Sequence, residues 1–140
     1  MQEYSRLVGI DVGKKRIGIA QTDLLKTISS PVGTYSPELV FDALRLIVSQ
    51  SKVDKFIVGW PLMPNGQEGD SITMVKEFIN KLTFEFPEIS IEKIDERNTS
   101  NKAIQLMVEA GISKKKRREK ERVDRIAAAV ILQHYLDEYY

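Results

Sequence analysis

Three acidic residues at distant points of the sequence, Asp11, Glu96 and Asp124, have side chains suited to binding divalent metal ions. Asp11 lies inside an apolar segment, where a carboxylate loses hydration at high cost unless a cation or hydrogen-bond donors compensate. Mg²⁺ prefers carboxylate oxygens, and two such ions about 3.5–4 Å apart activate a water and stabilise the leaving oxygen of a phosphodiester. We therefore interpret the three acids as catalytic residues and as ligands of Mg²⁺ or Mn²⁺.

Each acid also has a purely structural interpretation. Asp11, taken alone, is more simply an acceptor of hydrogen bonds from the amides of the turn that follows it. Asp124 would be favoured in a first helical turn by the helix dipole, and Glu96 would form a surface ion pair with Arg97. Adjacent strand residues point to opposite faces, so only one of Asp95 and Glu96 is expected to face the site. We favour Glu96, but the sequence leaves this alternation open.

The positions of the acids within predicted elements favour the catalytic interpretation. Asp124 is followed at helical spacing by Ala127, Ala128 and Ile131, all apolar, which predicts that it lies on the face that packs inward. The small alanines would also let this helix approach the sheet closely. Glu96 follows a predicted strand, and ligands bind at the carboxyl ends of strands in open α/β sheets.

Hydrophobic patterning predicts the elements that must position these acids. A nearly continuous apolar run is typical of a central strand covered on both faces, and strands that alternate with helices after an opening meander predict a mixed sheet flanked by helices. Ser36 and Pro37 are predicted to start the first helix, with Ser as its cap. The fourth strand is predicted to pair parallel to the first, and Pro31 places the third strand at an edge. The predicted strands are 7–11, 17–22, 32–35, 55–59 and 89–94, and the helices begin near residues 36, 70, 99 and 122.

Basic residues gather in clusters, although the formal net charge is only +1. Local clusters matter more than the total for binding a polyanion, so we predict that they contact a nucleic-acid backbone. The cluster from Lys114 to Arg118 has an alternative interpretation as a solvated connection that binds nothing. The predicted nucleic-acid contacts are Lys14, Lys15, Arg16 and Arg97, together with Lys114, Lys115, Lys116, Arg117 and Arg118.

Composition narrows the remaining possibilities. A chain of 140 residues is expected to form one domain over residues 1–140. It holds no cysteine and one histidine, His134, which excludes disulfides, thiolate sites and a two-histidine zinc site. We expect His134 on a helix surface and Trp60 in packing or in anchoring a loop. No apolar run is long enough for a membrane span and no signal-peptide pattern opens the chain, so we predict a cytoplasmic protein without membrane partners.

Four motifs occur in order along nearly the whole chain. They are Gly9-Ile10-Asp11-Val12-Gly13-Lys14-Lys15-Arg16-Ile17-Gly18-Ile19-Ala20, Val58-Gly59-Trp60-Pro61-Leu62 with Asn65-Gly66, Asp95-Glu96-Arg97 with Thr99, and Val123-Asp124 with Ala127-Ala128. Together they resemble the YqgF (RuvX) family of pre-ribosomal-RNA nucleases, also called Holliday junction resolvases. Trp60 and Asn98 stand where this family usually has leucine or a similar residue, which bears on the fit of the substrate.

The resemblance implies a fold, a site and an activity. The fold would be RNase H-like, with a five-stranded mixed sheet of order 3-2-1-4-5 flanked by helices. Asp11, Glu96 and Asp124 would occupy the acidic site of a bacterial cytoplasmic nuclease that matures the 5′ end of small-subunit ribosomal RNA. The partner would be structured RNA or branched DNA, and the protein a monomer or a homodimer.

Three alternatives remain at this point. A Holliday junction resolvase would cut branched DNA, and a non-catalytic ribosome assembly factor would bind RNA without needing Asp11. A nucleotide-dependent phosphotransferase of the actin and sugar-kinase type also opens with an Asp-x-Gly turn, but it needs two such domains and this chain supplies one.

Overall fold

A computed structural model describes residues 4–61, 65–69, 71–95 and 120–140, with the side chains of the last range described from residue 126. Within these ranges no helix is long and apolar enough to cross a membrane. The elements follow in the order β1 (Arg6–Val12), β2 (Ile17–Thr22), β3 (Ser29–Tyr35), α1 (Val40–Gln50), β4 (Val53–Trp60), α2 (Ser71–Glu85), β5 (Ser90–Asp95) and α5 (Lys120–Tyr139). The helix predicted from residue 99 lies outside the described residues.

The strands form one mixed sheet of order β3-β2-β1-β4-β5, as predicted. β1 pairs antiparallel with β2 and parallel with β4, and β4 pairs parallel with β5. β3 is an edge strand, where Pro31 is tolerated because its missing N–H is not needed by a further strand. The carboxyl ends of β1, β4 and β5 therefore lie along the same side of the sheet, which we call its carboxyl edge.

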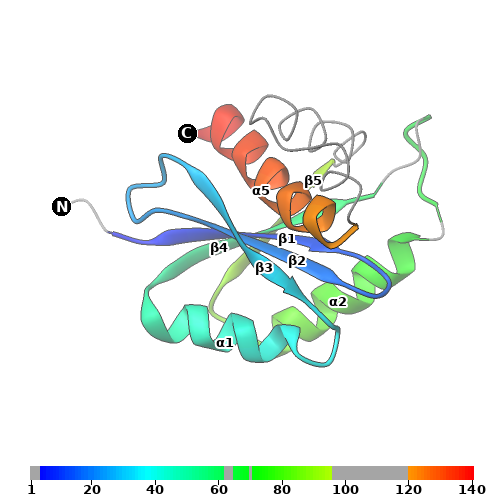
Figure 1. Ribbon diagram of the computed structural model, residues 1–140, viewed down its shortest axis with the longest axis horizontal. Helices are drawn as coiled ribbons and strands as arrows, with labels where there is room; N and C mark the ends of the chain where they lie inside the picture. The colour runs from blue at the N-terminus through cyan, green and yellow to red at the C-terminus, as the bar shows by residue number, and fades with distance from the viewer. Residues whose placement is uncertain (1–3, 62–64, 70, 96–119) are drawn as a thin grey trace.

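Helices cover both faces of the sheet, with α1 and α2 on one face and α5 on the other (Figure 1). Successive residues of β1 alternate between two cores because side chains in a strand point to opposite faces. Val8, Ile10 and Val12 belong to the core covered by α1 and α2, which also contains Phe56 and Val58. Leu7 belongs to the second core, which β1, β2 and β4 form with Ala128, Ile131, Leu132, Tyr135 and Leu136 of α5.

The start of α1 differs from the sequence prediction. The helix begins at Val40, and its N-cap is Leu39 without a side-chain capping hydrogen bond. The carbonyl of Ser36 instead accepts hydrogen bonds from the amides of Leu39 (3.1 Å) and Val40 (3.0 Å). The fixed φ of Pro37 suits the second position of a turn as well as a first helical turn, so Ser36-Pro37 forms the turn that leads into the helix.

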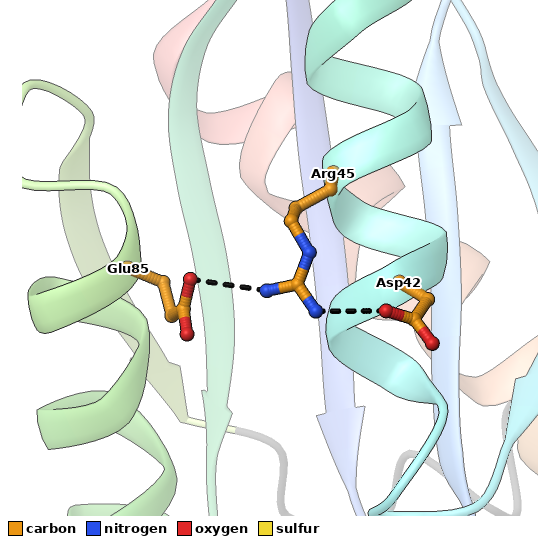
Figure 2. A network of polar contacts seen from close by, with 3 residues as sticks. All are labelled: Asp42, Arg45 and Glu85. Carbon is orange, nitrogen blue, oxygen red and sulfur yellow. Dashed lines mark hydrogen bonds and ion pairs between the residues drawn. The ribbon is translucent and has the colours of Figure 1, made fainter.

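Arg45 links the two helices on the first face (Figure 2). Its guanidinium donates to Asp42 at 2.7 Å and to Glu85 of α2 at 3.0 Å. Exposed ion pairs of this kind add little stability. The rings of Phe41 and Phe78, with centroids 5.4 Å apart, and the core beneath them carry the packing of α1 against α2.

A polar network fastens the second half of α5 to the sheet. The hydroxyl of Tyr135 donates to Glu92 Oε2 at 2.6 Å, and Lys55 Nζ lies 3.0 Å from Glu92 Oε1. Tyr135 and Lys55 hold the pKa of Glu92 below its ordinary value, while burial and the Glu92 acceptor raise the pKa of Tyr135. Tyr135 is only 3% exposed, so its ring is held by packing while its hydroxyl bonds to Glu92. Together these contacts fix the position of α5 along the direction of β4 and β5.

Replacing Tyr135 by Phe is expected to lower the free energy of unfolding by about 1 kcal/mol, because its hydroxyl loses the hydrogen bond that it donates to the half-exposed Glu92 carboxylate and the longer one that it accepts from Lys55. The lowered pKa of Glu92 means that this stabilisation is full above its ordinary value of 4.5 and is lost as the pH falls through the folded-state value. Urea denaturation from pH 7 to pH 3 should therefore show the two proteins converging in acid. Tyr139→Phe, on the exposed part of the same helix, is the control and should match the parent.

Candidate functional site

Asp11 lies near the carboxyl end of β1 and is half-buried, opposite Gly18 of β2. Alternation along β1 places it on the same face as Leu7 and Gly9, which is the face that α5 covers. A Cβ atom added to Gly9 would lie 2.7 Å from Cβ of Leu132 and 3.1 Å from the carbonyl oxygen of Ala128. The backbones of β1 and α5 therefore approach each other closely two residues before Asp11.

The helix α5 runs opposite to β1. Its residue Tyr135 contacts Lys55, which is level with Leu7 at the start of β1, whereas Ala128 is level with Gly9. Moving along β1 toward Asp11 thus corresponds to moving toward the start of α5, and Figure 1 shows that start, in orange, toward the end of the sheet where β1 turns into β2.

Asp124 falls within α5, one helical turn before Ala128, and its side chain lies outside the described residues. Two strand residues advance by about 6.6 Å and one helical turn by about 5.4 Å, so the steps from Gly9 to Asp11 and from Ala128 to Asp124 are similar in length and direction. The predicted inward face of this helix is confirmed by its neighbours, because Ala127, Ala128 and Ile131 are all buried.

Side chains along β5 alternate between the two faces. Glu92 bonds to Tyr135 of α5 and Ile94 packs against the α5 core, whereas Ile91 packs against the opposite core and Lys93 lies over Trp60. The strand ends at Asp95, which belongs by this alternation to the face of Lys93. Glu96 lies just beyond the described residues.

The predicted nucleic-acid contacts are described only in part. Lys14 and Lys15 are exposed and Arg16 is half-buried in the turn between β1 and β2, closed by a 3.0 Å hydrogen bond from the Gly13 amide to the Arg16 carbonyl. Arg97 and the cluster from Lys114 to Arg118 lie outside the described residues. The structure thus confirms a basic surface turn directly after Asp11, and its contacts with nucleic acid stay a prediction.

A hollow of about 180 Å³ adjoins this turn on the other face of the sheet, between α1 and α2. Gly13 and Lys14 line it together with Phe41 and Lys81. Asp11, on the α5 face, does not line this hollow. The hollow is therefore separate from the candidate acidic site.

The metal site predicted from the sequence stays a prediction. Among the side chains that the structure describes, no three of His, Cys, Asp and Glu come together as a possible metal site. Of the predicted ligands, only the side chain of Asp11 falls within that part. Its carboxylate, half-buried at a strand end beside a close helix, offers the oxygen donor that a hard divalent cation prefers.

Several features of this region were not anticipated from the sequence. They are the network around Tyr135, the close approach of α5 at Gly9 and the contact of Lys93 with Trp60. For the first, alternation along β5 separates Glu92 from Ile91, but the sequence does not show that α5 covers the face of Glu92. The two remaining predictions hold, since His134 sits partly exposed on α5 with Nε2 2.7 Å from Glu138 and Trp60 packs against the core.

Comparison with known proteins gives matches along nearly the whole chain. The family model described as "RuvX: Holliday junction resolvase" matches residues 5–138. A Porphyromonas gingivalis protein is 44% identical over 132 residues, covering 94% of this chain and 96% of its own length. A Chlorobium phaeobacteroides protein is 40% identical over 132 residues, covering 94% of this chain and 92% of its own. Both carry the name "Putative pre-16S rRNA nuclease".

Two solved structures share the fold. Thermus thermophilus RuvC in complex with a Holliday junction substrate has a TM-score of 0.55 at 13% identity, covering 97% of each chain. The yeast mitochondrial Holliday junction resolvase has a TM-score of 0.54 at 10% identity, covering 99% of this chain and 83% of its own. The RNase H-like fold predicted from the sequence is confirmed by this likeness.

Proposed function

Because the chain belongs to the RuvX family of Holliday junction resolvases, we propose that it is a metal-dependent nuclease acting on structured nucleic acid. The observation that carries this proposal is the matched geometry of Asp11 and Asp124. Gly9 and Ala128 are in close contact. Asp11 lies two residues beyond Gly9 on β1 and Asp124 one helical turn before Ala128 on α5, and because the two elements run in opposite directions both displacements lead toward the carboxyl end of β1. This correspondence supports a site in which an acid on β1 and an acid on α5 would lie at one end of a close-packed interface.

The alternation of β5 supports Glu96 as the third acid. Glu92 and Ile94 face α5, so the next position in that series is residue 96 and not Asp95. Glu96 would then share the helix-covered face with Asp11. This argument favours Glu96 over Asp95, the choice that the sequence leaves open.

Asp11, Glu96 and Asp124 would together hold divalent Mg²⁺ or Mn²⁺, which supplies Lewis-acid stabilisation of the phosphoryl oxygens when bound. The half-burial of Asp11 under α5 restricts the orientation of its carboxylate. Lys14, Lys15 and Arg16, on the turn that follows, would hold the nucleic-acid backbone by its phosphates, and Arg97 and Lys114 to Arg118 would extend that contact. We treat residues 1–140 as one nuclease domain.

The names of the relatives favour the precursor of small-subunit ribosomal RNA as the substrate. The description of the family favours branched DNA as a second candidate. A resolvase acting on a two-fold symmetric junction is expected to work as a dimer, whereas an RNA-trimming enzyme has no such requirement. The oligomeric state of the active species therefore separates the two substrates.

Removal of divalent metal is expected to abolish cleavage while leaving the fold intact. The purified protein would be incubated with labelled precursor ribosomal RNA and with labelled four-way DNA junctions, in Mg²⁺, in Mn²⁺ or in EDTA. Metal-dependent cleavage of the RNA at its 5′ side supports the proposal. Binding of RNA without cleavage under any of these conditions would instead identify a non-catalytic assembly factor, and cleavage in EDTA would contradict the metal.

A further inference from the structure

Trp60 and Lys93 form a cation–aromatic pair at the carboxyl edge of the sheet. Lys93 Nζ lies 4.2 Å from the centroid of the indole ring. Trp60 is the last residue of β4 and is half-buried, packed against the core that α1 and α2 cover, whereas Lys93 is exposed. Because the ring is fixed by packing, it restricts where the ammonium group of Lys93 can lie.

The partner of Lys93 in the structure is an aromatic ring and not a carboxylate. In the described part of the chain Arg45, Lys55 and Lys76 each form an ion pair with a carboxylate, although Lys55 also lies 5.8 Å from the centroid of the Tyr135 ring. The contact that the structure gives Lys93 is an aromatic ring, which attracts a cation without cancelling its charge. Lys93 therefore presents a positioned positive charge to the solvent.

This charge lies at the same edge of the sheet as the candidate site. β1, β4 and β5 are parallel neighbours, so Asp11, Trp60 and Lys93 all come near the carboxyl ends of their strands. Two strand spacings, about 10 Å, separate β5 from β1. Lys93 projects from the face opposite to Asp11, so a nucleic-acid strand whose reacting phosphate is at Asp11 would have to cross the edge to reach it.

We propose that Lys93 binds a backbone phosphate that flanks the reacting one, and that Trp60 is the positioning residue that holds Lys93 for this contact. The inference rests on the proposed nuclease function and adds a substrate contact on β5 to it. A nucleic-acid chain extends well beyond the bond that is cut, and its flanking phosphates need cations at fixed places to set its register. Lys14, Lys15 and Arg16 then hold the strand at β1, and Lys93 holds it at β5.

The chain contains a single tryptophan, so intrinsic fluorescence reports directly on this edge. Unlabelled precursor-rRNA fragment or four-way DNA junction would be titrated into the protein in EDTA, where binding is measured without cleavage. Tryptophan emission should change and should saturate at the same concentration as the anisotropy of a labelled copy of the same nucleic acid. Circular dichroism would establish that each variant below is folded.

Lys93→Gln should raise Kd severalfold and lower the slope of log K against log salt by about 0.7–0.9, the value for one lost phosphate contact. Trp60→Leu keeps the lysine and an apolar side chain, so it should raise Kd by less. The double variant should bind like Lys93→Gln alone, because both changes act on one contact. Lys52→Gln, at the opposite edge of the sheet before β4, is the matched control and should leave the slope unchanged.

The outcomes separate this inference from the proposed function. The Lys93 contact alone would be overturned by three results together. The parent protein would cleave its substrate, Lys93→Gln would bind with the parent's salt slope, and the tryptophan emission of the parent would not change on binding. Weaker binding in Lys93→Gln with no change in Trp60→Leu would overturn the positioning role of the indole. A protein that binds neither RNA nor junction would refute the nuclease proposal and this contact together.

Discussion

Replacing Asp11 by Asn is expected to reduce metal-dependent cleavage by about 10²–10³-fold while the protein stays folded. A metal ligand that loses its charge removes several kcal/mol of transition-state stabilisation, and each 1.36 kcal/mol is a factor of ten in rate. Asn keeps the size of Asp and its ability to accept hydrogen bonds, so the half-buried position on β1 remains filled. The measurement is single-turnover cleavage of labelled substrate at saturating Mg²⁺.

The control for this variant is Asp42→Asn. Asp42 is an exposed acid on α1, on the other face of the sheet, where it pairs with Arg45. Its neutralisation should leave the cleavage rate unchanged, because it removes a carboxylate of the same chemistry from outside the site. An Asp11→Asn protein that cuts at the parent rate would refute metal-assisted hydrolysis at this site. Loss of folding in thermal melts would instead return Asp11 to a structural role in the turn.

The full order of the sheet is implied by the family resemblance, and much of the strand pairing is also predictable from hydrophobic patterns and from general rules of connection. An apolar run with a following turn gives β1 and β2, Pro31 marks an edge strand, and a helical crossover requires β4 to lie parallel to β1. The inward face of α5 is predictable for the same reason, since Ala127, Ala128 and Ile131 recur at helical spacing. The hairpin, the edge strand and the helix face use residues that are close in sequence, and the pairing of β1 with β4 follows from the general rule for a helical crossover.

Features that depend on contacts between distant residues could not be predicted in this way. The hydrogen bond between Tyr135 and Glu92 joins residues 43 positions apart, and the charge of Glu92 gives no sign of its partner. Gly9 looks like one of several glycines until α5 is placed above it. The start of α1 is a further case, because Ser followed by Pro suits both a helix cap and a preceding turn, and hydrogen bonding decides between them.

Tertiary structure also decides whether Asp95 or Glu96 is the favoured site acid. Sequence alternation gives Asp95 and Glu96 opposite faces but does not say which face carries the site. The contact of Glu92 with α5 supplies that information, because residues 92 and 94 lie on the helix-covered face and residue 96 would be next in that series. The proposed assignment of Glu96 therefore depends on a contact four residues earlier in the chain.

Gly9→Ala tests whether the close approach of β1 and α5 sets the geometry of the site. The added methyl group would lie 2.7 Å from Cβ of Leu132, which has no freedom to rotate away, and 3.1 Å from the carbonyl oxygen of Ala128. The helix must therefore move away from the sheet. We expect a loss of about 1–2 kcal/mol in the free energy of unfolding, as in other overpacked cores, and an outward shift of the first turns of α5.

That shift should lower the cleavage rate of the folded protein by about 10–10²-fold, because a misplacement of about 1 Å can cost about 10²-fold in rate. Gly33→Ala is the matched control, since its methyl group would meet the end of the Tyr35 side chain at 3.1 Å, on an edge strand, where the ring can adjust. Denaturation and single-turnover cleavage would be measured on both variants.

A Gly9→Ala protein that loses stability but keeps its rate per folded molecule would show that the spacing of β1 and α5 does not position Asp11 and Asp124. A loss of rate per folded molecule in both Mg²⁺ and Mn²⁺ would support a role for this helix–sheet contact in positioning the acids.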